Sequence, residues 1–281
     1  MTFSIAARDG DAWGVAVASK FLSVGSIVPR VGARGPAVAS QALARVAYLD
    51  ELEQAVGSGA TASGALADAV GADPGREDRQ VGVVGPDGAA TYTGSQCLDW
   101  AGGRSGGTGR EAYAIQGNIL TGPGVVEDME AAWHAGAGDR LDHRLLRVLL
   151  AGDAAGGDAR GRQSAALLVK AAGAGYDGCG ILADLRVDDH PDAPTELARL
   201  HTLSTLFFGT AEDVRPLVDA LRAEVAGRLE ALGQPSADRS VEEALEAWMS
   251  TANLENRASP DGIDARVLDE LRAATPDRAA G

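Results

Sequence analysis

Residues 2–18 read TFSIAARDGDAWGVAVA, and this stretch decides how the fold begins. Two apolar runs of β-strand character flank a polar turn, Asp9-Gly10-Asp11, and this pattern predicts an antiparallel hairpin. The second run ends in Ser19-Lys20. If the two strands pair, Lys20 comes within reach of Thr2 at the start of the first strand.

Thr2 directly follows Met1, and this position is chemically informative. Methionine aminopeptidases remove Met before small residues, which would leave a threonine carrying its own α-amine. Such an amine has a reference pKa of about 7.7–8.0, so it can serve as a general base at neutral pH. A threonine with its own amine as base is a recognised nucleophile. The alternative is a surface strand that begins Met-Thr without catalytic reason.

Composition bounds the class of protein. The chain has 281 residues, which suits one large domain or two smaller ones. It is 45% hydrophobic but only 4% aromatic, so the core must be rich in Ala, Val and Leu. The net charge of −15 argues against nucleic acid and against an anionic membrane surface, which both attract basic proteins.

The expected location is the cytoplasm, with free thiols at Cys97 and Cys179. The N-terminus lacks the basic segment and continuous apolar run of a signal peptide, and no run approaches transmembrane length. Cys97 as a nucleophile is the alternative to an inert thiol. We expect a small-molecule substrate and no metal or organic cofactor, and a homo-oligomer stays open.

The order of elements predicts an α+β fold. Strands open the chain, helices follow, and a hairpin around Pro86-Asp87-Gly88 comes next, then a strand at 112–118. Helices are expected at about 123–135 and 139–151, with late strands at 164–169 and 181–187. Two packed sheets with a helical layer outside each would bury this pattern. The glycine-rich stretch 102–107 is interpreted as a flexible loop.

The last part of the chain has a different character. Residues 192–209 and 211–232 are strongly helical in pattern, 233–238 are expected to be a linker, and Ser240 with Glu243 forms a capping box. We therefore predict a first domain over 1–210 and a small all-α module over 211–281.

Several polar side chains are candidates for chemistry. Lys20 would lower the pKa of a neighbouring nucleophile or amine, although a solvated strand end is the simpler interpretation. Asn118 ends an apolar strand, where its amide can donate to a developing oxyanion, or can simply form a turn. The predicted substrate-binding set also contains Ser19 and Gln41.

The loop before residue 164 supplies Asp158, Arg160, Arg162 and Gln163. An arginine there can hold a substrate carboxylate in a bidentate contact, and a structural Arg–Asp network is equally compatible. Asp189 and His190 complete the substrate-binding candidates. They look like part of a metal or acid–base cluster, but neighbours in an extended segment point apart, so we expect no metal there.

Segments along most of the chain resemble the DUF1028 family, which belongs to the N-terminal nucleophile hydrolase superfamily. The resemblance is carried by Thr2-Phe3-Ser4-Ile5, Gly14-Val15-Ala16-Val17-Ala18-Ser19-Lys20, Arg79-Gln80-Val81-Gly82-Val83-Val84, Cys97-Leu98-Asp99-Trp100-Ala101-Gly102, Gln116-Gly117-Asn118-Ile119-Leu120, Gly161-Arg162-Gln163-Ser164-Ala165-Ala166-Leu167 and Asp184-Leu185-Arg186-Val187-Asp188-Asp189-His190. It implies a four-layer αββα fold and a nucleophile at the mature N-terminus, which here is Thr2.

The tail resembles a peptidoglycan-binding module found at the C-terminus of some family members. The matching pieces are Leu229-Glu230-Ala231-Leu232-Gly233, Trp248, Asn253-Leu254-Glu255-Asn256-Arg257 and Ile263-Asp264-Ala265-Arg266-Val267-Leu268. The missing export signal argues against a cell-wall enzyme, so peptidoglycan binding is doubtful.

Two functional hypotheses follow. The first is a hydrolase of a C–N amide bond in a small, acidic substrate, with Thr2 as nucleophile, Lys20 tuning it and Asn118 supporting the oxyanion. The second is a non-enzymatic binding protein on an αββα scaffold, docked to glycan or protein through its tail. Removal of Met1 distinguishes them, because a binding module has no use for a free Thr2 amine.

Overall fold

The computed structural model describes residues 2–234 and 239–275. Its contacts divide the chain into two units, Met1–His201 and Thr202–Gly281. The predicted boundary at 210/211 lies later in the chain. The division falls inside helix α5 (Ala193–Phe208), because Leu197 packs in the core of the first unit whereas Leu206 packs in the core of the second.

The first unit contains two antiparallel sheets. The larger sheet consists of β1 (Thr2–Asp9), β2 (Ala12–Ser19), β7 (Gly102–Thr108), β8 (Glu111–Asn118), β9 (Ser164–Ala171) and β10 (Ile181–Val187). Its order is β10-β9-β2-β1-β8-β7. The smaller sheet consists of β3 (Pro29–Val31), β4 (Ala37–Ala42), β5 (Arg79–Val84) and β6 (Ala89–Thr93), in sequence order. The predicted opening hairpin is confirmed, with Phe3 opposite Ala18.

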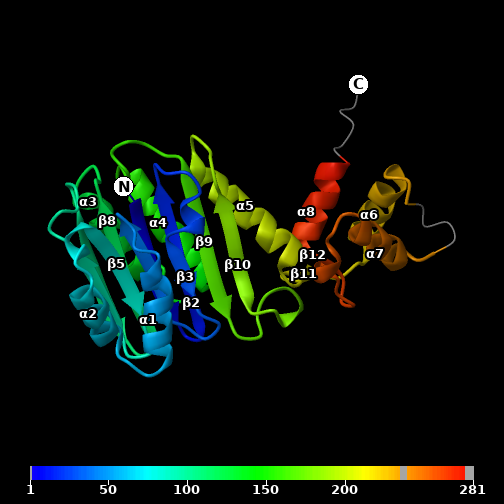
Figure 1. Ribbon diagram of the computed structural model, residues 1–281. Helices are drawn as coiled ribbons and strands as arrows, with labels where there is room; N and C mark the ends of the chain where they lie inside the picture. The colour runs from blue at the N-terminus through cyan, green and yellow to red at the C-terminus, as the bar shows by residue number, and fades with distance from the viewer. Residues whose placement is uncertain (1, 235–238, 276–281) are drawn as a thin grey trace. The chain divides into compact units, whose positions relative to one another are not determined.

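Helix pairs cover the sheets. The pair α1 (Ala47–Gly57) and α2 (Ala62–Ala72) packs against the smaller sheet through Tyr48, Leu52 and Leu66. The pair α3 (Gly124–Ala135) and α4 (Leu141–Ala154) packs against the larger sheet. In Figure 1 the first pair lies on one side of the strands and α4 on the other. A third apolar cluster, with members such as Val15 and Ala39, lies between strands of both sheets.

Strand β1 shows how the sequence alternation places side chains. Phe3 and Ile5 belong to the cluster under α3 and α4, whereas Ala6 belongs to the cluster shared by the two sheets. Successive side chains of a strand point to opposite faces. Thr2 and Ser4 therefore face the smaller sheet, and both are buried.

The loop prediction for 102–107 is wrong. These residues form most of β7, which pairs with β8 along its length, for example Arg104 opposite Ile115. The glycines carry no side chain that could show alternation, so the strand is invisible in the pattern. The helix predicted from 211 begins only at Asp219, in α6 (Asp219–Ala231), because β11 (Val214–Arg215) and Pro216 precede it.

The second unit is mainly helical. It contains α6, α7 (Val241–Thr251) and α8 (Ala265–Ala274), and β12 (Ile263–Asp264) pairs with β11. Its core joins Val225, Leu245 and Leu268 from the three helices. The predicted capping box is confirmed, since Ser240 Oγ accepts from Glu243 N at 3.1 Å and Glu243 Oε2 accepts from Ser240 N at 2.7 Å. Most of the predicted linker, 235–238, lies outside the described residues. Within the described part of the chain, no helix is long and apolar enough to cross a membrane.

The end of α2 is joined to β5 by a carboxylate with an altered pKa. Asp73 accepts from Gly75 N at 2.8 Å, Tyr48 Oη at 2.9 Å and Arg79 Nε at 3.0 Å. The Gly75 amide, with Arg79 and Tyr48, lowers the pKa of Asp73 from 3.8 to about 2. Because the folded pKa lies below the unfolded one, this carboxylate stabilises the fold above pH 3.8 and the contribution is lost as pH falls through 2.

We therefore expect Asp73→Asn to remove one source of acid sensitivity. Between pH 4 and pH 2, the melting temperature of the wild type should fall further than that of the variant, because an asparagine side chain has no carboxylate to protonate. Thermal melts recorded across this range for both proteins measure the difference. If the melting temperatures of the two proteins fell equally with pH, the Asp73 contacts would not be the source of this pH dependence.

Candidate functional site

Thr2 begins the central strand β1 and is buried, with 5% of its surface exposed. Its Cα pairs with that of Asn118 at the end of β8. On the other side, the Thr2 Oγ1 lies 3.1 Å from Ser19 Oγ at the end of β2. Three strand ends therefore meet here, and the predicted residues Thr2, Ser19 and Asn118 are neighbours.

A network of neutral side chains lies behind Thr2, between the two sheets. Gln41 Nε2 donates to the Thr2 carbonyl at 3.2 Å and to Gln80 Oε1 at 2.8 Å. Asn118 Nδ2 donates to the same Gln80 oxygen at 2.9 Å. Gln41 Oε1 accepts from Ser4 Oγ at 2.6 Å. Gln41 thus contacts the Thr2 backbone. Gln80 links Gln41 to Asn118, because its oxygen accepts a hydrogen bond from each of the two amides.

The network continues to Gln116, and it depends on a glycine. Gln116 Nε2 donates to Ser4 Oγ at 2.7 Å. Its Oε1 lies against Gly82 in β5, where a Cβ would come within 2.1 Å of that oxygen. A side chain at residue 82 would therefore displace this amide from its place between the sheets. We name Ser4, Gln41, Gln80, Gln116 and Asn118 the amide network.

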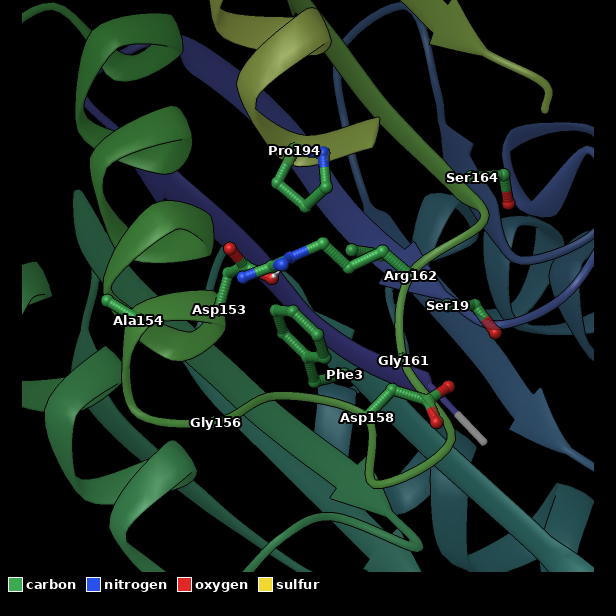
Figure 2. Close-up of a pocket in the computed structure, with 11 residues that line it drawn as sticks. Phe3, Ser19, Asp153, Ala154, Gly156, Asp158, Gly161, Arg162, Ser164 and Pro194 are labelled. Carbon is green, nitrogen blue, oxygen red and sulfur yellow. Dashed lines mark hydrogen bonds and ion pairs between the residues drawn. The ribbon is translucent and has the colours of Figure 1, made fainter. Parts of the chain in front are cut away.

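A cavity of about 270 Å³ adjoins Ser19. Its wall includes Phe3, Asp153, Asp158, Arg162 and Ser164. Figure 2 shows the Arg162 side chain crossing the cavity toward Asp153. Asp158 and Ser19 lie on the other side of the Phe3 ring from Asp153. The wall therefore carries charged groups of both signs, and we name this space the polar cavity.

The loop carrying Asp158 is attached to the ends of two strands. Asp158 pairs with Leu120 just after β8, and its Oδ2 accepts from Lys20 N at 2.7 Å. Its Oδ1 accepts from Arg160 N at 2.9 Å, and Arg160 Nη2 lies 3.3 Å from Oδ2. Asp158 is thus a structural anchor of the cavity wall, and the alternative Arg–Asp network is present.

Arg162 has an acidic partner as well. Its Nε donates to Asp153 Oδ1 at 2.6 Å, and this contact raises the pKa of the Arg162 guanidinium. A guanidinium has five N–H groups, and only one of them makes this bond. The Nη groups of Arg162 therefore retain donors, and a second carboxylate, that of Asp192, lies 3.7 Å from Nε. The predicted role of Arg160 competes with its contact to Asp158.

Lys20 lies at the site's edge rather than beside the Thr2 hydroxyl. Its Nζ donates to the carbonyl of Arg162 at 3.3 Å, and its side chain is exposed. Side chains of neighbouring residues in an extended segment point apart, so Ser19 rather than Lys20 reaches Thr2. Any electrostatic effect of the ammonium on Thr2 acts through solvent and is screened.

Gln163, Asp189 and His190 form a layer behind the strand end. Gln163 N donates to the Ser19 carbonyl at 3.1 Å, and Gln163 Nε2 donates to Asp189 Oδ1 at 3.1 Å. The Gln163 carbonyl accepts from His190 N at 2.7 Å. Of the described residues that line the polar cavity, none is Gln163, Asp189 or His190. Their contacts position Ser19 from behind.

A second cavity, of about 300 Å³, lies on the Asn118 side. Its wall consists of Ala42, Leu43, Asp78, Gln96, Cys97, Leu98, Asn118 and Ile119. Cys97 is half-buried, and burial raises the pKa of its thiol. A neutral thiol is a weak nucleophile, which favours the inert interpretation of Cys97.

A cluster with metal-binding side chains lies elsewhere. Potential ligand atoms of Asp142, His143 and His201 lie within 4.8 Å of one another. However, Arg140 contacts both carboxylate oxygens of Asp142, at 2.6 and 2.7 Å, and His201 Nε2 lies 2.8 Å from Oδ2. A guanidinium at this position opposes a cation. Asp142 also precedes Asp153 by about 16 Å along α4, so the cluster is remote from the polar cavity.

Sequence reasoning missed Gln80, Gln116, Ser4, Phe3 and Asp153. The amides carry a signal that was available, because Gln80 and Gln116 interrupt apolar strands where a buried amide requires hydrogen-bond partners. Asp153 and Phe3 carry none, since their approach to Arg162 depends on the packing of α4 against β1.

Two family models match the chain. The one described as "Family of unknown function (DUF1028)" covers residues 2–197, and the one described as "Putative peptidoglycan binding domain" covers residues 207–271. Among solved structures, a DUF1028 protein from Silicibacter pomeroyi is 31% identical, with a TM-score of 0.63, over 73% of this chain and 89% of that chain. A search of curated proteins gives no match. The extent of the first match shows that this chain belongs to the DUF1028 family.

Proposed function

We propose that the protein hydrolyses a C–N amide bond of a small substrate, with Thr2 as an N-terminal nucleophile. The observation that carries the proposal is the meeting of three strand ends around Thr2, where its Oγ1 lies 3.1 Å from Ser19 Oγ and a cavity adjoins Ser19. The proposal requires a free Thr2 amine, and therefore a mature chain that begins at Thr2.

In the proposed reaction, Thr2 Oγ attacks the amide carbonyl carbon while its proton passes to the Thr2 amine. The tetrahedral oxyanion collapses, the C–N bond breaks, and the Thr2 ammonium gives its proton to the leaving nitrogen. Water then attacks the Thr2 ester, again giving a proton to the amine. The carboxylic acid leaves and Thr2 Oγ regains its hydrogen.

The neighbouring side chains have distinct proposed roles. Asn118 has two amide N–H groups, of which one donates to Gln80 Oε1 at 2.9 Å, so the other is the candidate oxyanion donor. Ser19 orients the Thr2 hydroxyl. Arg162 is the candidate partner for a carboxylate of the substrate. Lys20 contributes a screened positive charge at the edge.

The finer description of the fold also belongs to this proposal. Helix pairs lie outside two facing sheets, which supports a four-layer αββα arrangement of the N-terminal nucleophile hydrolase type. Fold likeness alone does not establish an activity, so the argument for hydrolysis rests on Thr2 and its surroundings.

The first test of the proposal is the intact mass of the purified protein. We expect a mass lower than that of the full sequence by one methionine residue, because a peptide-bonded nitrogen cannot act as the base. Intact-mass spectrometry with N-terminal sequencing measures this. Active protein that retains Met1 would overturn the mechanism.

The second test concerns Asn118. Asn118→Ala should lower kcat about 10²–10³-fold, the usual cost of losing one oxyanion donor, with a smaller change in KM. Steady-state kinetics on any amide substrate found by screening provide the measurement. Asn118→Asp keeps the size but removes the donors, so it should be at least as slow. An active Asn118→Asp enzyme would exclude the oxyanion role.

For the second unit we propose binding to glycan, on the support of the family-model match over 207–271. A pull-down of the purified protein with insoluble peptidoglycan tests this directly. Retention that is equal for wild type and for Thr2→Ala would show that binding is separate from the reaction, and no retention of either protein would overturn the proposal.

A further inference from the structure

The cavity on the Asn118 side differs in chemistry from the polar cavity. Its wall is largely apolar, with Ala42, Leu43, Leu98 and Ile119. Leu43 and Leu98 are 64% and 66% exposed, so both side chains are accessible to a ligand. Small-molecule sites are typically concave, mostly apolar and about 300–1,000 Å³, with a few polar groups that fix orientation. Here Asn118 supplies such a group next to Thr2.

Two residues of the wall have a strained backbone. Ala42 has φ of 67° and Ile119 has φ of 48°, in the left-handed region. This conformation is a genuine outlier for a β-branched residue such as isoleucine. Strain of this kind persists where the surroundings enforce it, and it gathers at ligand sites. The residues just before these two, Gln41 and Asn118, both donate to Gln80 Oε1, so the amide network sets the start of each wall segment.

Backbone hydrogen bonds fix the rest of the wall. Ile119 N donates to the Leu98 carbonyl at 2.9 Å, and Leu43 N donates to the Asp78 carbonyl at 3.2 Å. Cys97 Sγ donates to the Arg79 carbonyl at 3.4 Å. The apolar side chains are therefore presented on a preformed frame, and a ligand would not have to order it.

We propose that this cavity binds an aliphatic group attached to the scissile amide, and we name it the aliphatic subsite. The substrate class is then an amide with an alkyl group on one side and a polar part on the other. The alkyl chain lies against Leu43 and Leu98, and the amide carbonyl lies at Asn118, with the polar part of the substrate on the other side of the carbonyl. This assignment rests on the proposed function for its orientation relative to Thr2.

The two cysteines make the subsite observable without turnover. Cys97 lines the cavity and is half-buried. Cys179 is exposed and is not among the residues that line this cavity. A ligand in the subsite should shield Cys97 from N-ethylmaleimide and leave Cys179 unprotected. Mass spectrometry of the two peptides gives both rates from one sample, so Cys179 is the internal control.

The experiment uses Thr2→Ala protein and a series of straight-chain primary amides: acetamide, butanamide and hexanamide. Burial of a methylene is worth enough to tighten binding about fourfold, so protection of Cys97 should strengthen about 15-fold from butanamide to hexanamide. Leu43→Asp should weaken hexanamide protection about tenfold or more. Leu22→Asp, at another leucine that is 58% exposed, should leave protection unchanged.

The outcomes separate the two proposals. Protection of Cys97 that grows with chain length and falls in Leu43→Asp supports the aliphatic subsite, whether or not Thr2 is the nucleophile. Protection that is absent, independent of chain length or equal at Cys179 overturns it. If turnover of an amide substrate depends on Thr2 while the amide series gives no protection, the proposed function stands and the subsite falls.

Discussion

Thr2→Ala should reduce turnover by on the order of 10⁴-fold or more, with the fold intact. Removal of a covalent nucleophile eliminates the ester pathway, and the remaining groups recover only a small part of the acceleration. The Thr2 hydroxyl contacts Ser19 Oγ at the start of β1, so its loss removes this hydrogen bond at a strand end. Single-turnover and steady-state kinetics measure the effect, and a thermal melt monitors folding.

Thr2→Ser is the matched control for this prediction. Serine keeps the hydroxyl and the α-amine, so it should retain a measurable fraction of turnover, whereas alanine keeps the amine alone. Substantial activity in the alanine variant would mean that another group attacks the carbonyl. In that case a different nucleophile must carry the reaction, and the site around Thr2 must have another role.

The second large effect is expected at Arg257, in the second unit. Arg257→Met should lower the free energy of unfolding of this unit by about 3–5 kcal/mol, the cost of breaking a buried ion pair. Arg257 and Asp264 lie 3.0 Å apart with side chains 1% and 0% exposed. Arg257 also donates to the carbonyls of Leu206 and Thr210. Removing it would leave a buried carboxylate without its cation and several carbonyls without donors.

Hydrogen exchange of the full-length protein would localise this loss. Amide protection in α7 and α8 should fall by roughly 10²-fold to 4 × 10³-fold, since each 1.4 kcal/mol is tenfold, while protection in β1 stays near the wild-type value. The matched control is Arg222→Met, whose exposed pair with Glu242 is worth less than about 1 kcal/mol. Equal effects of the two substitutions would show that the Arg257 contacts are no more important than a surface pair.

Much of the fold could be predicted from the sequence because its signals are local. The hairpin of β1 and β2 follows from two apolar runs around Asp9-Gly10-Asp11, and the capping box marks the start of α7. Strand β7 could not be predicted, since its glycines show no alternation. The boundary between the units lies within α5, where a continuous helix leaves no break in the pattern.

The residues of the candidate site also fall into those that local signals predict and those that they do not. The ends of the predicted strands indicate that Thr2, Ser19 and Asn118 belong to one site, because strand pairing fixes which residues become neighbours. The position of Lys20 in the chain predicts that it lies near Thr2, but in the structure its Nζ donates to the Arg162 carbonyl. The pairing of Arg162 with Asp153 joins a loop to the end of α4, and such long-range contacts leave no local trace in a sequence.

The amide network has a consequence for the conditions under which the protein can work. Its members are Ser4, Gln41, Gln80, Gln116 and Asn118, and all of these side chains are neutral hydrogen-bonding groups. Dissolved ions weaken attractions between charges, with a Debye length of about 3 Å at 1 M, but leave buried contacts between dipoles almost untouched. The hydrogen bonds that position Thr2 and Asn118 should therefore keep their strength at high salt concentration, even in a molecule whose net charge is −15.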